Sequence, residues 1–146
     1  MPRTKGKLKK LRVIPLGGLD EIGKNLTVLE YSDSMLIIDC GLGFPNDDML
    51  GIDLVVPDIT YLVSNADKIK GIVLTHGHED HIGGIPYLLQ KLNVPIYGTR
   101  LTLGILENKF NEHVFDFKPE LHCVQAGDKV TLGLFEVEFI LSLIHI

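Results

Sequence analysis

The stretch THGHEDH, residues 75–81, decides how the rest of the chain is interpreted. It has the pattern H-x-H-x-D-H, so that three of the six histidines and one aspartate fall within six residues, directly after an apolar run. The end of a buried strand is a rigid platform for side chains. On that platform the alternating His76 and His78 can point into one site. Asp80 and His81 then turn toward a neighbouring site.

These residue types predict a metal centre. Imidazole nitrogens and a carboxylate suit zinc, and open positions on such a metal leave room for water. Two metals a few Å apart can share a hydroxide and polarise a phosphoryl oxygen. The alternative is that these are ordinary polar loop residues. That alternative would fit a single histidine better than four candidate ligands at this spacing, flanked by Gly77 and followed by Gly83-Gly84.

Asp39 is the second candidate of the site. It ends the unbroken apolar run 35–39 (MLIID), which is typical of a strand covered on both faces, and it precedes Gly41. At the edge of a sheet its carboxylate could accept a hydrogen bond from the ligand-bearing loop and fix the orientation of a histidine. The alternative is a turn-forming aspartate that follows a strand.

The segments around these motifs predict a layered α/β or α+β sandwich. Strands are expected at 11–16, 25–31, 35–39, 71–75 and 94–97, with a hairpin turn at Ser32-Asp33-Ser34. Helices are expected at 58–68, 82–92 and 100–110. Two strands from residue 121 onward flank Gly127-Asp128, which is a hairpin signal. Residues 40–57, rich in Gly, Pro, Asn and Asp, predict a long loop.

The composition predicts a soluble chain of about one average domain, with 146 residues, 45% of them hydrophobic and 23% charged. It excludes a disordered chain, which would lack the apolar surface to offset its ordering entropy. No apolar run approaches the roughly 20 residues that a membrane-spanning helix needs. The basic N-terminus leads into no apolar segment of the secretory kind. We therefore expect a cytoplasmic protein with no membrane partner.

Charge and cysteine placement add two expectations. The net charge is −5, yet residues 1–12 contain six Lys or Arg and no acidic residue. We expect residues 1–10 to form a basic flexible arm, which could contact RNA phosphates or could simply aid solubility. Cys40 and Cys123 lie far apart without a C-x-x-C partner, so a disulfide is not expected. Each is expected to be a small buried apolar residue.

Together, Asp39 and the H-x-H-x-D-H motif resemble the metallo-β-lactamase fold family, an αββα sandwich with a dinuclear metal site at its strand ends. Five further segments are similar to the bacterial ribonuclease J group of that family, which also carries a β-CASP domain. They are 15–25 (PLGGLDEIGKN), 39–45 (DCGLGFP), 49–53 (MLGID), 83–86 (GGIP) and 95–99 (PIYGT). The resemblance covers residues 11 to about 140.

The resemblance implies that His76 and His78 bind one Zn2+ and that Asp80 and His81 bind a second. Asp39 would be the carboxylate behind these ligands, and Asp39 and Asp80 would be the catalytic carboxylates. The implied activity is 5′-to-3′ exonuclease and endonuclease cleavage of RNA, in RNA decay and rRNA maturation. A hydroxide that bridges the two metals would attack the phosphorus.

The resemblance also implies a Ca2+ ion on the loop that contains Gly51 and Asp53, because oxygen ligands suit this cation. The alternative there is an exposed loop aspartate. When full-length, such a protein is expected to form a homo-oligomer or a complex with a paralogue, and to join an RNA-degradation complex.

The family's pattern extends past what this sequence contains. It requires further histidines, an aspartate that bridges both metals, an inserted β-CASP domain and a C-terminal region. We therefore expect residues 11–140 to be the N-terminal portion of an incomplete metallo-β-lactamase domain, and this fragment to be inactive. Residues 141–146 (LSLIHI) replace an Asn-His-Ser-like turn. We expect them not to be native, so His145 is not counted as a ligand.

Two other functions stay open at this stage. A small-molecule hydrolase of the same fold, such as a thioesterase or lactonase, would explain the zinc motif but not residues 17–25. A non-catalytic RNA-binding subunit is supported only by the basic arm.

Overall fold

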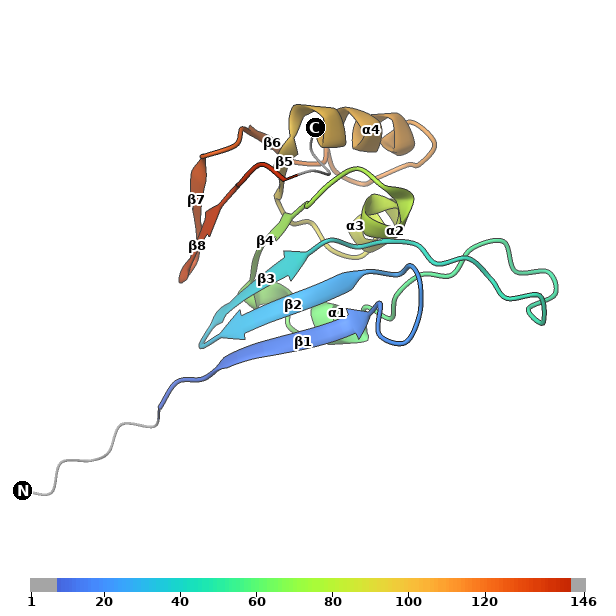
Figure 1. Cartoon of the computed structure of the whole chain (residues 1–146), viewed down its shortest axis with the longest axis horizontal. Helices are drawn as coiled ribbons and strands as arrows, with labels where there is room; N and C mark the ends of the chain where they lie inside the picture. Colours follow the sequence, from blue (N-terminus) through green and yellow to red (C-terminus); the bar gives the residue numbers. More distant parts are fainter. Residues whose placement is uncertain (1–7, 143–146) are drawn as a thin grey trace, which may run out of the picture.

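A six-stranded sheet lies at the centre of the computed structural model, which describes residues 8–142 (Figure 1). Its strands follow one another in sequence order. They are β1 (Leu11–Gly17), β2 (Leu26–Tyr31), β3 (Ser34–Ile38), β4 (Ile69–Val73), β5 (Ile96–Thr99) and β6 (Leu121–Val124). The pairs β1·β2 and β2·β3 are antiparallel, whereas β3·β4, β4·β5 and β5·β6 are parallel. The predicted hairpin at Ser32-Asp33-Ser34 is confirmed, because β2 and β3 pair across it.

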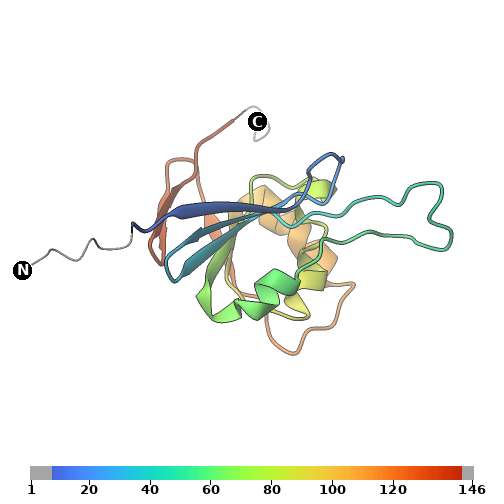
Figure 2. The same ribbon diagram turned by 90° about the horizontal axis from the view of Figure 1, so that it is seen from below.

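The helices and a separate hairpin cover the two faces of this sheet, as the turned view shows (Figure 2). The helical segments are α1 (Thr60–Ser64), the 3-10 helix η1 (Ala66–Lys68), α2 (Glu79–Ile82), α3 (Ile85–Leu89) and α4 (Arg100–Phe110). The hairpin consists of β7 (Lys129–Leu132) and β8 (Phe135–Glu138). Most of the expected arm and tail, residues 1–7 and 143–146 with His145, lie outside the described residues.

Strand β3 is apolar throughout because both of its faces are covered. Met35 and Ile37 join the cluster beneath the helices. Leu36 points the other way and packs with Val73 and Leu132 in the cluster beneath the β7–β8 hairpin. Alternate side chains of a strand face opposite sides of the sheet, so a strand buried on both sides loses the usual polar alternation.

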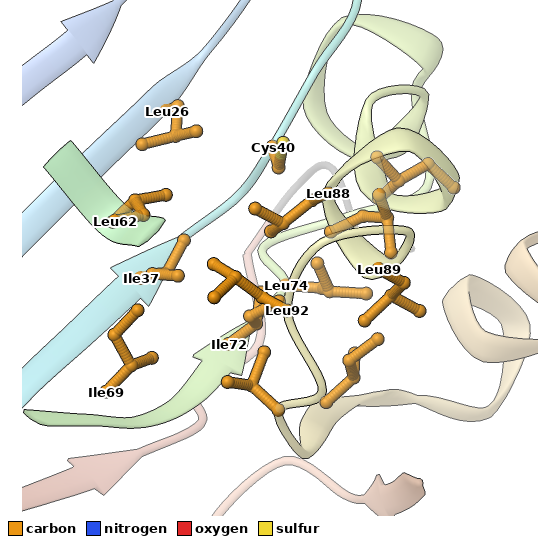
Figure 3. Packing of buried hydrophobic residues seen from close by; sticks show 14 of the residues in the cluster. Leu26, Ile37, Cys40, Leu62, Ile69, Ile72, Leu74, Leu88, Leu89 and Leu92 are labelled. Atoms are coloured by element: carbon orange, nitrogen blue, oxygen red, sulfur yellow. The ribbon is translucent and has the colours of Figure 1, made fainter. Parts of the chain in front are cut away.

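The larger core fixes the strands that position the site (Figure 3). Ile37 of β3 and Ile72 of β4 are fully buried there with Leu62 of α1 and Leu88 of α3. Each such side chain contributes roughly 1.5–3 kcal/mol when it leaves water. This burial holds the carboxyl ends of β3 and β4 side by side, at the point where both candidate motifs follow.

The expected helix at 82–92 is wrong in its bounds. Helix α2 begins earlier, inside the histidine motif, and the helix is interrupted at Gly83 and Gly84 before α3 starts. A Cβ on Gly84 would lie 2.9 Å from Gly41 O and 3.0 Å from Cys40 O, and the Gly84 N–H donates to Cys40 O at 2.8 Å. Close contact with the segment after β3 therefore interrupts the helix.

The expected hairpin around Gly127-Asp128 is also wrong. A turn occurs there, with Gly127 at φ +91°, but the flanking strands belong to different sheets. Strand β6 pairs in parallel with β5, while β7 pairs with β8 across a turn that contains Gly133. Gly127-Asp128 forms the predicted turn, but the partners of each strand depend on packing that local sequence does not specify.

The expected long loop between β3 and α1 is confirmed, and in both views it projects from the body (Figures 1 and 2). Backbone hydrogen bonds of 2.8 and 3.2 Å between Gly43 and Val55 close its base. Leu50 and Phe44 are exposed on it. Across residues 8–142, none of the helices has the length and apolar character needed to cross a membrane.

Candidate metal centre

The candidate site forms where β3 and β4 end next to each other. Asp39 directly follows β3, and its N–H donates to Val73 O at 3.0 Å. Asp39 has φ +60°, a left-handed conformation that is uncommon outside glycine and that aspartate tolerates better than most residues. This backbone turn places a carboxylate that is only 4% exposed beneath the loop with the histidine motif.

The Asp39 carboxylate accepts three hydrogen bonds from that loop. Its Oδ1 accepts the Thr75 N–H at 2.8 Å, and its Oδ2 accepts the Thr75 hydroxyl at 2.6 Å. The same Oδ2 lies 2.7 Å from Nδ1 of His81. The predicted contact between Asp39 and a histidine of the motif is therefore present, as a hydrogen bond to His81.

These bonds assign the tautomers of two imidazoles. Because a carboxylate only accepts, Nδ1 of His81 carries the proton, and its Nε2 keeps a lone pair when the ring is neutral. Nδ1 of His76 lies 2.9 Å from the Thr75 hydroxyl oxygen. Because that hydroxyl donates its hydrogen bond to Asp39, its oxygen accepts a hydrogen bond from Nδ1–H of His76. Nε2 of His76 therefore also keeps a lone pair.

The four candidate ligands are gathered in one cluster. The ring centroid of His76 lies 4.5 Å from that of His78 and 4.1 Å from that of His81. Nε2 of His81 lies 3.6 Å from Oδ2 of Asp80. Burial first, and then the neighbouring His81 and His78, lower the pKa of His76 and favour its neutral form. A neutral imidazole is the form that binds a metal.

The nitrogen and oxygen atoms of the cluster meet some, but not all, of the requirements of a zinc site. Two ligand atoms on a tetrahedral zinc lie roughly 3.4 Å apart, which is close to the separation of His81 Nε2 and Asp80 Oδ2. Within residues 8–142, however, no three His, Cys, Asp or Glu side chains form a group that could by itself hold a metal ion. The described residues therefore offer oriented candidate ligands without a full coordination sphere.

Gly51 and Asp53 do not fit a calcium site in this structure. Both are exposed on the projecting loop. Calcium takes six to eight oxygen ligands, and no metal-binding group of three acidic, histidine or cysteine side chains occurs in the described part of the chain. Calcium stays a prediction from the resemblance.

Two neighbours of the site extend what the motif alone suggested. Thr75 links Asp39 to His76, a role that sequence reasoning missed, although a hydroxyl residue before the first histidine was its visible signal. A cavity of about 660 Å3 adjoins His76 at the strand ends and is lined on its far side by Val137 and Phe139.

The two cysteines differ in their surroundings. Cys40 is buried as expected, and burial, followed by the nearby Asp39 charge, raises the pKa of its thiol to about 12. Cys40 therefore stays a neutral thiol. The expectation that Cys123 is buried is wrong, because it lies exposed on edge strand β6. Both cysteines are free, as predicted.

A family model for the metallo-β-lactamase superfamily matches residues 19–142, which include Asp39 and the whole histidine motif. The chain belongs to the metallo-β-lactamase superfamily. Among solved structures, a protein of unknown function from Enterococcus faecalis V583 superposes with a TM-score of 0.62 at 19% identity, over 90% of this chain and 37% of that one. A B3 metallo-β-lactamase superposes with a TM-score of 0.54 at 18% identity, over 86% and 47%. These likenesses confirm the predicted fold class, a metallo-β-lactamase-like α/β sandwich of which the chain spans a part.

Curated relatives in this superfamily are considerably longer. Ribonuclease J of Synechocystis sp. (strain ATCC 27184 / PCC 6803 / Kazusa) is 52% identical over 132 residues, which are 89% of this chain and 21% of that protein. Ribonuclease J2 of Bacillus subtilis (strain 168) is 46% identical over 131 residues, 90% of this chain and 24% of that protein. The chain thus spans less than a quarter of the length of these relatives, and the predicted resemblance to ribonuclease J is confirmed.

Proposed function

We propose that this chain is the N-terminal part of a zinc-dependent ribonuclease that hydrolyses phosphodiester bonds of RNA. The observation that carries the proposal is the Asp39 carboxylate, which orients His81 directly and His76 through Thr75. The 52% identity to a protein named Ribonuclease J supports RNA as the substrate class. A domain that had lost catalysis would have no need to keep this arrangement intact.

Each polar residue of the cluster has a distinct task in the proposed enzyme. His76 and His78 would hold one zinc ion, and Asp80 and His81 the other. When bound, the metals supply Lewis-acid stabilisation of charge on the phosphoryl oxygens. Asp39 keeps the proton on Nδ1 of His81, so that Nε2 stays available as a ligand atom. His78 and Asp80 are the more exposed ligands and lie where a substrate can approach.

The finer features of the proposal rest on the resemblance to ribonuclease J. We infer that the full-length protein acts both 5′-to-3′ and internally on RNA, in RNA decay and rRNA maturation in the cytoplasm. It would work as a homo-oligomer or with a paralogue, within an RNA-degradation complex. Residues 11–140 would be the opening portion of its metallo-β-lactamase domain, with the remaining ligands and the β-CASP domain further along the gene product.

The test uses the full-length gene product, loaded with zinc, on labelled single-stranded RNA. His78→Ala is expected to lower kcat by about 100-fold or more, because even residues behind a ligand typically contribute 10–100-fold. His113→Ala is the matched control, since that imidazole packs edge-to-face against Tyr87 and stacks on Phe115. It should retain activity within about twofold. Circular dichroism verifies that both variants fold.

Each contrary result favours a specific alternative. If His78→Ala degrades RNA at the wild-type rate, the protein is an RNA-binding subunit whose histidine motif is not catalytic. If the wild type hydrolyses a thioester or lactone and leaves RNA intact, it is a small-molecule hydrolase of the same fold. A stop codon directly after residue 140 in the gene would contradict the longer enzyme.

A further inference from the structure

The segment 17–25, which resembles the opening segment of the ribonuclease J group, contributes none of the predicted metal ligands, yet it ends against the site. Its last residue, Asn25, immediately precedes β2. The Asn25 N–H donates to Asp80 O at 3.2 Å, and Asn25 O accepts the Gly41 N–H at 3.0 Å. The backbone of Asn25 therefore lies between the segment that follows Asp39 and helix α2, which carries Asp80.

The side chain of Asn25 adds contacts to the same residue. Its Nδ2 lies 3.0 Å from Asp80 O and 3.3 Å from Asp80 Oδ2. Both are acceptors, so the amide must present its NH2 group to Asp80. The same Nδ2 lies 3.5 Å from Nε2 of His81, the atom that Asp39 leaves with a lone pair.

Glycines make this close approach possible. A Cβ on Gly41 would lie 1.6 Å from Asp80 O, which no side chain could tolerate. A Cβ on Gly18, which has φ +84°, would lie 2.7 Å from Oδ1 of Asn25. A side chain at position 41 would collide with the backbone of Asp80, and one at position 18 would collide with the amide of Asn25.

We propose that Asn25 is a positioning residue for the metal centre, which orients the carboxylate and the backbone of Asp80 toward the position that a metal would take beside His81. A neutral amide suits this task because it donates hydrogen bonds without bringing a positive charge to a site that must hold a cation. A lysine or arginine there would compete with the metal for the carboxylate. The inference rests on the proposed metal centre, and it assigns a role to the segment 17–25.

The variant Asn25→Ala in the full-length protein tests the proposal. Competition with a chromophoric chelator measures its metal affinity, and the absorption spectrum of the Co2+-substituted protein reports the geometry of the site. We expect the affinity for one of the bound ions to fall about tenfold and the spectrum to change. Asn65→Ala is the matched control, because Nδ2 of Asn65 also donates to a backbone carbonyl, Tyr61 O at 2.8 Å, at the end of α1. Asn25→Leu keeps the side-chain bulk without the donors and should reproduce the loss.

A second readout needs no metal. Hydrogen exchange in the metal-free protein should become faster in the segment 79–82 of Asn25→Ala and stay at the wild-type rate there in Asn65→Ala. Wild-type affinity, spectrum and exchange in both Asn25 variants would overturn the proposal, as would an equal loss in Asn65→Ala. A wild-type protein that retains no zinc would refute the metal centre itself. Exchange alone would then decide whether Asn25 holds the Asp80 segment.

Discussion

At the scale of single residues, the site depends on one buried carboxylate. Asp39 accepts hydrogen bonds from Thr75 and His81, and through the Thr75 hydroxyl it also fixes the ring of His76. Removing either the carboxylate or the hydroxyl would free an imidazole to rotate or to change its tautomer. Because ligand geometry depends on these hydrogen bonds, small changes behind the ligands should reach the metal.

The variant Thr75→Val tests the link through the hydroxyl. Valine keeps the shape of threonine but can neither donate to Asp39 nor accept from His76. We expect the affinity for zinc in the full-length protein to fall about tenfold, with the fold retained. Chelator competition measures the affinity. Thr131→Val, an exposed threonine on β7, is the control and should bind zinc like the wild type. Equal affinities in both variants would show that the hydroxyl does not position His76.

At the scale of elements, a second buried carboxylate, that of Glu30, connects β1 and β2 with α1 and η1. These strands lie at the edge of the sheet opposite β6. Glu30 of β2 is 7% exposed. Its Oε2 accepts from Arg12 of β1 at 3.0 Å and from the Tyr61 hydroxyl of α1 at 2.7 Å, and Lys68 of η1 lies 3.6 Å from its Oε1. A buried charge needs such partners, so this group should contribute to stability and not to catalysis.

The variant Tyr61→Phe measures the contribution of that hydroxyl, and it should lower the free energy of unfolding by about 1–2 kcal/mol at neutral pH. The hydrogen bond to Glu30 raises the pKa of Tyr61 above its usual 10. The hydroxyl's contribution is therefore complete below pH 10 and is lost as the pH rises through the raised pKa. Urea unfolding of both proteins should give a difference that shrinks above pH 10. Tyr31→Phe, on the same strand as Glu30, is the control. A difference that grows with pH would contradict this assignment.

At the scale of the whole molecule, the described residues hold oriented candidate ligands without a full coordination sphere. Part of the cavity beside His76 is lined by residues 139–142 after β8, and Leu141 is exposed. The segment that it shares with the relatives covers only 21–24% of their length. Metal affinity and activity therefore belong to the proposed longer protein.

The 146-residue chain expressed alone is accordingly expected to cleave no RNA and to bind zinc weakly. The physical reason is that each metal would receive two ligands from this chain, where zinc usually requires three or four from the protein. Metal analysis after dialysis should find little zinc on the 146-residue chain and two ions on the full-length protein. Two tightly retained ions on the short chain would contradict the division of ligands proposed here.

The sequence by itself determined the elements with local signals and predicted the residues of the candidate site. The histidine motif, the turn at Ser32-Asp33-Ser34 and the helix at 100–110 all depend on residues a few positions apart, and local spacing directly encodes local geometry.

Only the tertiary structure decided which distant residues meet. Asp39 and His81 are 42 positions apart, and Asn25 and Asp80 are 55 apart. Tertiary contacts also place β6 and β7 in different sheets and interrupt the helix at Gly83-Gly84. Such contacts depend on the packing of whole elements and on the close approach that glycine permits, and neither leaves a periodic pattern in the sequence.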